Sequence, residues 1–210
     1  FDCTFNDEKT LEDALNNLKK DTEIAVRKGI TQIVLSDKNI SEKNYPIPTL
    51  LSVGAVHTNL VRLGLRGYVS INVQSGECLD THSFATVIGV GATTVNPYLA
   101  FDSLYERFQK KLFGNLSFDD CVIRYIKSVN LGLLKIMSKM GISVLSSYRG
   151  GCNFETVGLS RTIVDEYFPG VTSKISGIGL TGIEKKIRNI HKDAFKTSSN
   201  ILPIGGIYRY

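Results

Sequence analysis

The chain has 210 residues, of which 42% are hydrophobic, and carries a formal net charge of +5. A chain of this length can form one sizeable domain that buries roughly 70% of its unfolded surface. No apolar run approaches the ~20 residues of a membrane span, and no signal peptide is visible, so a membrane protein is not expected. Because the first residue is Phe1 rather than Met, we expect a segment of a longer sequence.

The basic residues do not form a pattern typical of nucleic-acid binding. They occur as short pairs, Lys19–Lys20, Lys110–Lys111 and Lys185–Lys186, each of which lies near acidic residues. No basic stripe carries interleaved aromatic residues, which favours solvated helix faces over a nucleic-acid surface.

The cysteines are spaced too widely for a recognisable metal motif. Cys3, Cys78, Cys121 and Cys152 lie far apart, with no CxxC pair. This spacing favours free thiols in a reducing compartment, with a disulfide or a metal site as the alternatives. No zinc or iron–sulfur spacing is present.

The first half of the chain alternates helical and extended patterns. Apolar residues at steps of three or four predict helices, and short apolar runs predict strands. Thr10 and Asp13 form a variant capping box for the first helix, and Asp80 can cap the third. In chain order we predict a helix over 11–28, a strand over 30–35, a loop over 39–48, a helix over 49–63, a strand over 68–73, a helix over 81–90 and a strand over 92–95.

The second half of the chain continues with longer helical patterns. Asn96-Pro97 predicts a helix start, and Ser117 with Asp120 predicts another. Gly132 lies inside the second of these helices and permits a kink or two separate helices. The predicted buried residues are Phe101, Leu104, Tyr105 and Phe108 in the first of these helices, and Val122, Ile126, Val129, Leu133, Met137 and Met140 in the second. We then predict a strand over 142–145, a helical turn over 153–157, a helix from Ser160 to Pro169 and a strand over 171–175. A capping box over 181–184 predicts the start of the last helix, which has Ile183, Ile187, Ile190 and Ala194 on one face.

One regularity indicates the fold class. Gly29, Gly64, Gly91 and Gly141 each follow a predicted helix and precede a predicted strand. The strands then end on small polar residues at Ser36-Asp37, Gln74-Ser75, Asn96 and Ser146-Ser147. Repeated helix–Gly–strand units predict an α/β fold with parallel strands, apolar on both faces. Four secure strands cannot close an eight-stranded barrel, so we expect a partial TIM-barrel-like fold or an open parallel sheet.

The sequence contains no recognisable catalytic constellation. Arg149, Gly150 and Gly151 form the best candidate for an anion site, because they follow a predicted strand and precede a helix start. An ordinary tight turn is the alternative. Gly89-Val90-Gly91 lacks the order of a phosphate loop and is interpreted as a helix end. His82 is a weak binding candidate, His57 lies in mid-helix without a motif, and His191 is interpreted as a packing or surface residue.

A long stretch of the chain resembles a known family. The run LGLLKIMSKMGISVLSSYRGG over 131–151, followed by FETVGL, is similar to the central region of the glutamate synthase large subunit. The segments LSDKN, PIPTLLSVGAVHTNLVRLGLR, HSFATVIGVGATTVNPYLAFDSL and VTSKISGIGL resemble that family in the same order. The chain departs from the family pattern at Lys38, at Ser83 and at Gly151-Cys152-Asn153, which leaves the role of the last loop open.

The resemblance implies a piece of a larger enzyme that makes L-glutamate from glutamine and 2-oxoglutarate by reductive amination. Residues 1–196 would be the later part of the central domain, and residues 197–210 a linker or tail toward the FMN-binding domain. The segment would be a scaffold between the amidotransferase and FMN sites that can help to wall the path of ammonia. No catalytic, cofactor-binding or metal residue is carried over to it.

The resemblance also implies the surroundings of the segment. FMN and a 3Fe–4S cluster would be held elsewhere in the parent enzyme, with NAD(P)H or ferredoxin as electron donor. Its partners would be the other domains of the same polypeptide, together with a small reductase subunit or ferredoxin, in the cytoplasm or a plastid. The alternatives are a stand-alone FMN- or phosphate-binding barrel enzyme, and a purely structural interaction module whose tail packs on another domain.

Overall fold

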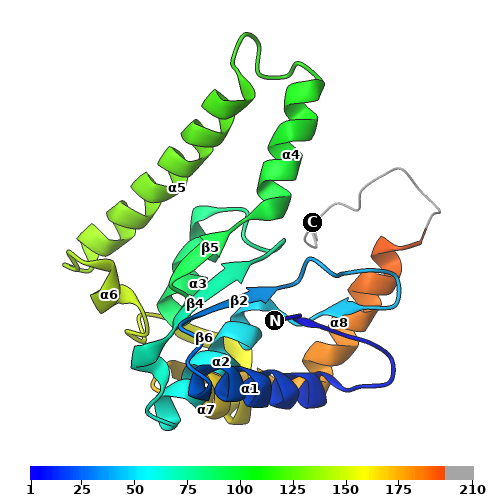
Figure 1. Cartoon of the computed structure of the whole chain (residues 1–210), viewed down its shortest axis with the longest axis vertical. Helices are drawn as coiled ribbons and strands as arrows, with labels where there is room; N and C mark the ends of the chain where they lie inside the picture. The colour runs from blue at the N-terminus through cyan, green and yellow to red at the C-terminus, as the bar shows by residue number, and fades with distance from the viewer. Residues whose placement is uncertain (197–210) are drawn as a thin grey trace, which may run out of the picture.

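The computed structural model describes residues 1–196; the predicted linker over 197–210 lies outside this range. Figure 1 shows a body in which helices pack against a small sheet, and from which α4 (Tyr98–Gln109) and α5 (Phe118–Lys139) project as a hairpin. No helix within the described range is long and apolar enough to cross a membrane. The elements in chain order are β1 (Thr4–Phe5), α1 (Leu11–Arg27), β2 (Gln32–Ser36), β3 (Tyr45–Pro46), α2 (Thr49–Arg62), the 3-10 helix η1 (Arg66–Tyr68), β4 (Ser70–Gln74), α3 (Thr81–Val90), β5 (Thr94–Asn96), α4 (Tyr98–Gln109), α5 (Phe118–Lys139), α6 (Leu145–Tyr148), β6 (Glu155–Leu159), α7 (Arg161–Tyr167), β7 (Thr172–Ile178) and α8 (Leu180–Ala194).

The central sheet is open and parallel. Its strand order is β2-β4-β5, and both pairs are parallel. Two smaller sheets accompany it: an antiparallel pair of β1 and β3, and a parallel pair of β6 and β7. The predicted α/β class and open parallel sheet are therefore confirmed, and the strands of residues 1–196 do not close a barrel.

The glycines that separate helix from strand have a backbone conformation that other residues rarely adopt. Gly29, Gly64 and Gly91 all have positive φ, and each lies between a helix and a strand of the central sheet. Positive φ is strained for other residue types, so glycine lets the chain leave the helix and turn back to the sheet. Gly141 has the same conformation at the end of α5, but no strand follows it.

The helices of residues 1–196 cover one face of the central sheet and leave the other face without a helix. Ile33 and Leu35 of β2, and Ile71 and Val73 of β4, are buried in the main hydrophobic core with residues of α1 and α2. The intervening Val34 is 46% exposed. The prediction that the strands are apolar on both faces was wrong, because β2 and β4 alternate between buried and more accessible positions.

Polar side chains form a ladder across the uncovered face. The amide of Asn72 in β4 donates to Gln32 Oε1 of β2 at 3.0 Å, and the Thr94 hydroxyl of β5 donates to Asn72 Oδ1 at 2.7 Å. These residues occupy exposed or half-buried positions. The hydrogen bonds hold the strands in register from the solvent side.

The helical hairpin differs in part from the predicted packing. α5 is a single continuous helix, and Val129 and Met137 are buried on its inward side as expected. Ile126 and Met140, however, are exposed. In α4 the predicted buried face was wrong at Tyr105, which is 52% exposed, and only Ala100 is fully buried there. The hairpin packs through aromatic contacts instead, in which Tyr105 and Phe108 each meet the Phe118 ring.

Two short segments after α5 adopt structures other than those predicted. Residues 142–145 are not a strand, because the chain there leads directly into the short helix α6. Tyr148 of α6 is buried, and its hydroxyl donates to the Ala85 carbonyl of α3 at 3.1 Å. The predicted helical turn over 153–157 is also wrong, since this segment forms β6, which pairs with β7.

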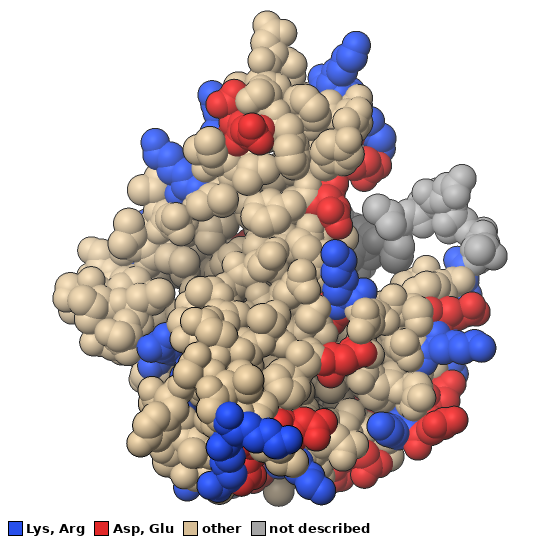
Figure 2. Space-filling model, viewed as in Figure 1, with Lys and Arg blue, Asp and Glu red and all other residues tan. Residues whose placement is uncertain are grey.

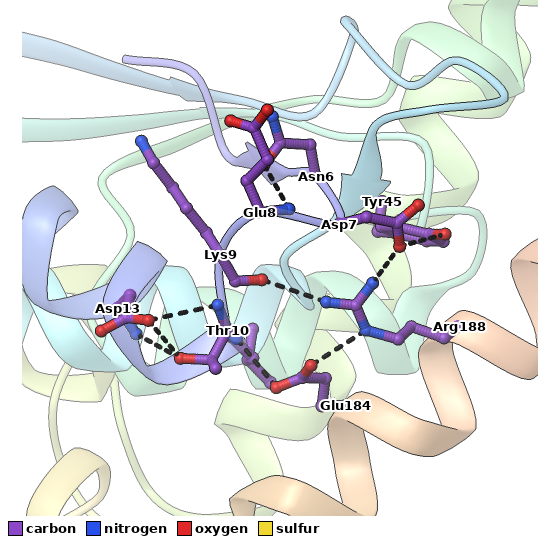
Figure 3. A network of polar contacts seen from close by, with 10 residues as sticks. Asn6, Asp7, Glu8, Lys9, Thr10, Asp13, Tyr45, Glu184 and Arg188 are labelled. Carbon is purple, nitrogen blue, oxygen red and sulfur yellow. Dashed lines mark hydrogen bonds and ion pairs between the residues drawn. The ribbon is translucent and has the colours of Figure 1, made fainter.

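The last described helix returns to the start of the chain. Figure 3 shows Arg188 of α8 donating to the Asp7 carboxylate at 2.6 Å and to the Lys9 carbonyl at 3.0 Å. Glu184 accepts from Arg188 Nε and from the backbone N–H of Leu11, the first residue of α1. The predicted capping box over 181–184 was therefore wrong, because α8 begins at Leu180 and Glu184 stabilises the N-terminus of α1 instead.

Candidate functional site

The polar residues predicted at the strand ends meet at the carboxyl edge of the central sheet. Asp37 follows β2 and is buried, and its carboxylate accepts from the Ser75 hydroxyl at 2.9 Å and from the Gly76 N–H at 3.0 Å. The Ser36 hydroxyl donates to Gln74 Oε1 at 2.8 Å. This edge is where open α/β sheets usually bind ligands.

The start of α2 is hydrogen-bonded to this edge of the sheet. Thr49 Oγ1 and Ser75 Oγ lie 2.6 Å apart, and the Thr49 N–H donates to the Glu77 carboxylate at 2.8 Å. Glu77 thus caps the N-terminus of α2, because the N-cap residue Pro48 has no side-chain acceptor. Burial, together with Asp37, raises the pKa of the Tyr98 hydroxyl to about 12. The strand-end groups are satisfied by one another, which is a structural rather than a ligand-binding arrangement.

The Arg149–Gly151 loop lies at a different place from the one predicted. It follows the short helix α6 and not a strand, so the structural premise of the anion site was wrong. The Gly150 N–H donates to the Gly89 carbonyl at 2.8 Å, and the Gly151 N–H donates to the Tyr148 carbonyl at 3.2 Å. Both backbone donors are therefore engaged, and Arg149 Nη1 donates to Thr93 Oγ1 at 3.3 Å. Anion binding here stays a prediction that depends on the remaining donors of Arg149.

A histidine–arginine cluster close to this loop was missed by the sequence analysis. Arg66 Nε donates to His57 Nδ1 at 3.0 Å, so the imidazole carries its own proton on Nε2. Arg66 also donates to the carbonyls of Val69 and Gly91. Burial, with the charges of Arg66 and Arg149, lowers the pKa of His57 to about 4. No short-range motif joins these residues, because His57 lies within α2 and Arg66 lies in η1, after the helix has ended.

The other two histidines differ in their surroundings. His191 is buried, as predicted for a packing residue; its Nε2 lies 2.9 Å from the Ser41 carbonyl, and its ring contacts Tyr45. His82 is exposed in the first turn of α3, where Asp80 caps the helix through the Ser83 N–H. It lines an apolar groove, and a binding role for it stays a prediction.

That groove lies among α2, α3, the β6–β7 pair and α8. It encloses about 500 Å³. Leu50, Val157 and Ile190 line it and remain exposed. Its polar members are few: His82, Thr86, Glu155, Thr156 and Lys186. A groove with this lining suits an apolar peptide or protein surface better than a charged ligand.

The described residues do not fit an iron–sulfur or metal site. Cys3, Cys78 and Cys121 are buried, Cys152 is exposed, and none forms a disulfide. Within residues 1–196, no three His, Cys, Asp or Glu side chains come together as metal ligands. Burial raises the pKa of the Cys3 and Cys78 thiols to about 12, which opposes the thiolate form that metal binding requires.

Comparison with known proteins identifies the family. A family model described as the glutamate synthase central domain matches residues 1–160. The chain is 51% identical over 202 residues to the glutamate synthase [NADPH] large chain of Azospirillum brasilense, covering 96% of this chain and 13% of that protein. It is 41% identical to the corresponding large chain of Bacillus subtilis (strain 168), covering 93% of this chain and 13% of that protein.

Ferredoxin-dependent enzymes are similar as well. The chain is 40% identical to the chloroplastic ferredoxin-dependent glutamate synthase of Spinacia oleracea, covering 93% of this chain and 13% of that protein. The chain thus spans only a small part of the relatives that it matches. From the extent of the family match and these identities, the chain belongs to the glutamate synthase central domain family.

Proposed function

We propose that this chain is a scaffold segment of a glutamate synthase, placed between the amidotransferase and FMN sites of the parent enzyme. That enzyme would form L-glutamate from glutamine and 2-oxoglutarate by reductive amination, and so assimilate ammonia. The match to the central domain family supports the placement. The names of the relatives support the reaction, and the 13% coverage supports a segment within a longer polypeptide.

The observation that carries the scaffold role is the face of the central sheet that the described helices leave uncovered. Parallel sheets are normally covered on both faces, because their strands are joined by helices and bury apolar surface on each side. Here α1 and α2 cover one face, and the Gln32–Asn72–Thr94 ladder lies on the other. We infer that another part of the parent polypeptide covers this face, and that the boundary formed there helps to wall the path of ammonia.

The domain assignment follows from the same proposal. Residues 1–196 form the later part of the central domain, and residues 197–210 link it to the FMN-binding domain. The partners are the amidotransferase, FMN-binding and β-helix domains, with a small reductase subunit or ferredoxin. Both NADPH and ferredoxin appear in the names of relatives, so either donor suits the proposal. The location is the cytoplasm, or a plastid as in the chloroplastic relatives.

The proposal assigns FMN and the 3Fe–4S cluster to other parts of the enzyme. The cysteines of residues 1–196 are dispersed, and the backbone donors of Gly150 and Gly151 are already engaged. A flavin phosphate would therefore have to bind through Arg149 side-chain donors alone. We expect this segment to hold neither group.

Titration of the purified 210-residue chain with FMN tests this proposal. Quenching of flavin fluorescence would be followed, with the complete large chain of a relative as positive control. A scaffold segment is expected to give no saturable quenching and no glutaminase or synthase turnover. One-to-one saturable binding that is lost in Arg149→Ala would instead favour a stand-alone flavin- or phosphate-binding protein.

A further inference from the structure

The apolar groove beside α8 exposes several large aliphatic side chains. Its wall includes Ile183, Ile187 and Ile190 of α8, faced by Val157 of β6 and Leu50 of α2. Ile190 is 60% exposed and Val157 64% exposed. Side chains of this size on one continuous surface mark a place where another segment packs.

The three isoleucines show how the groove runs relative to the chain. They lie three or four residues apart, so they share one face of α8 and extend toward its C-terminal end. From Ile183 to Ile190 the helix rises about 10 Å, and from Ile190 to Lys196 about 9 Å. A segment that leaves α8 and turns back would therefore meet the groove within one or two helical turns.

The residues that follow α8 have the composition to fill it. Residues 197–200, Thr-Ser-Ser-Asn, are polar, and seven of the next ten are Ile, Leu, Pro or Tyr: Ile201, Leu202, Pro203, Ile204, Ile207, Tyr208 and Tyr210. Four extended residues span at most about 14 Å, which is enough to reverse direction beyond Lys196. The eight residues that follow span at most about 28 Å, which exceeds the length of the isoleucine face.

We propose that residues 201–208 of this chain occupy the apolar groove, turning back along the Ile183–Ile187–Ile190 face of α8. Attachment to α8 gives this segment an effective local concentration that a separate molecule lacks. The groove then determines the direction in which the polypeptide leaves this segment. The inference concerns the chain alone and does not depend on the proposed reaction or on the neighbouring domains.

A single tryptophan tests the proposal, because the chain contains none. Tyr208→Trp in the full 210-residue chain places the only indole within the segment in question. Its emission is expected to be blue-shifted and protected from acrylamide. Ile190→Glu in the same background should shift the emission to that of a solvated indole, because a carboxylate would then lie in the groove.

Leu134→Glu is the matched control. Leu134 of α5 is also 60% exposed, lies near the end of its helix, and does not line the groove. This change should leave the emission of Trp at position 208 unshifted, and circular dichroism should show that all variants remain folded. A solvated emission in the Tyr208→Trp chain itself would overturn the proposal, as would equal effects of Ile190→Glu and Leu134→Glu. A blue shift that disappears on dilution would assign the groove to a second copy and would also overturn it.

Discussion

His57 shows how a residue without a motif acquires a defined chemical state. Its ring lies against Gly91, where a Cβ would come within 2.4 Å of Nδ1. Gly91 has φ of 144°, so both the backbone conformation and the close approach of the imidazole require glycine there. Arg66 donates to the same nitrogen and to the Gly91 carbonyl. The neutral imidazole therefore joins the middle of α2 to the C-terminal end of α3.

This pairing predicts a pH dependence of stability. The pKa of His57 is lowered to about 4 in the folded chain, mainly by burial, against about 6.5 when unfolded. Below pH about 6.5 the unfolded chain therefore binds a proton that the folded chain does not. Stability should fall as the pH falls from 6.5 toward 4, by on the order of 1 kcal/mol between pH 7 and pH 5 after allowing for partial exposure.

Urea unfolding of the chain at pH 7 and pH 5 measures this effect. His57→Gln should reduce the difference in unfolding free energy between the two pH values. His82→Gln changes an exposed histidine outside the cluster and should leave the difference as it is in the parent chain. Equal pH dependence in all three proteins would contradict the assignment to His57.

Local residue pairs were predictable, whereas distant ones were not. The capping boxes of Thr10 with Asp13 and of Ser117 with Asp120 are confirmed, because both partners lie within one helical turn. Thr181 and Glu184 have the same spacing, yet Glu184 bonds Leu11 and Arg188 instead. The N-terminus of α1 supplies Glu184 with a donor, the Leu11 N–H, that lies far away in the sequence and cannot be read from the local pattern.

Among the helices, α5 packs closely against the start of α3 because Gly132 of α5 has no side chain. A Cβ on Gly132 would lie 2.5 Å from Thr81 Cγ2 and 2.7 Å from Thr81 Oγ1. Glycine inside a helix costs about 1 kcal/mol relative to alanine. The close approach of the start of α3 gives a physical reason for the residue, and α5 remains one continuous helix around it.

Gly132→Ala should therefore destabilise the chain by about 1–3 kcal/mol, despite the higher helix propensity of alanine. Thermal or urea unfolding would measure the change. Thr81→Ala removes Cγ2 and Oγ1, so the double variant should recover part of the loss, and the two changes should not be additive. A stabilisation by Gly132→Ala alone would mean that α3 and α5 do not approach as described.

Short apolar runs were the least predictable elements. The run at 142–145 has the composition of a buried strand but leads into α6, where Tyr148 reaches the Ala85 carbonyl. Over so few residues, apolar composition does not distinguish a strand from an irregular segment that packs on a helix. The error carried over to Arg149–Gly151, since the anion prediction assumed a strand before the loop.

At the scale of the whole molecule, apolar surface is distributed unevenly. Ile123, Leu131 and Leu134 of α5 are exposed, whereas Val129 and Met137 of the same helix are buried. In Figure 2, charged residues are interspersed over much of the visible face, but the region over the end of α5 and α6 is mostly uncharged. Several large apolar side chains exposed on one helix often mark a surface that another part of a protein covers. This agrees with a segment that packs against other parts of a polypeptide.

The isolated chain is therefore expected to self-associate as its concentration rises. Changing Ile123, Leu131 and Leu134 together to Gln should lower the weight-average mass toward that of the monomer in sedimentation experiments. Changing Lys127, Lys135 and Lys139 of the same helix to Gln is the control, and should not reduce association. A chain that stays monomeric at all concentrations would show that the exposed apolar residues of α5 do not drive association.

The α/β class, the N-terminal caps of α1 and α5 and the family could be recognised from the amino-acid sequence alone. Glycines with positive φ, capping pairs and 3.6-residue periodicity act within a few residues, so they can be recognised before the chain is folded. The folded structure was needed to show that helices of residues 1–196 cover one face of the sheet, that the strand-end groups bond one another, that His57 meets Arg66, and that an apolar groove runs beside α8. Each of these depends on residues far apart in the chain, whose approach is set by the packing of the whole molecule.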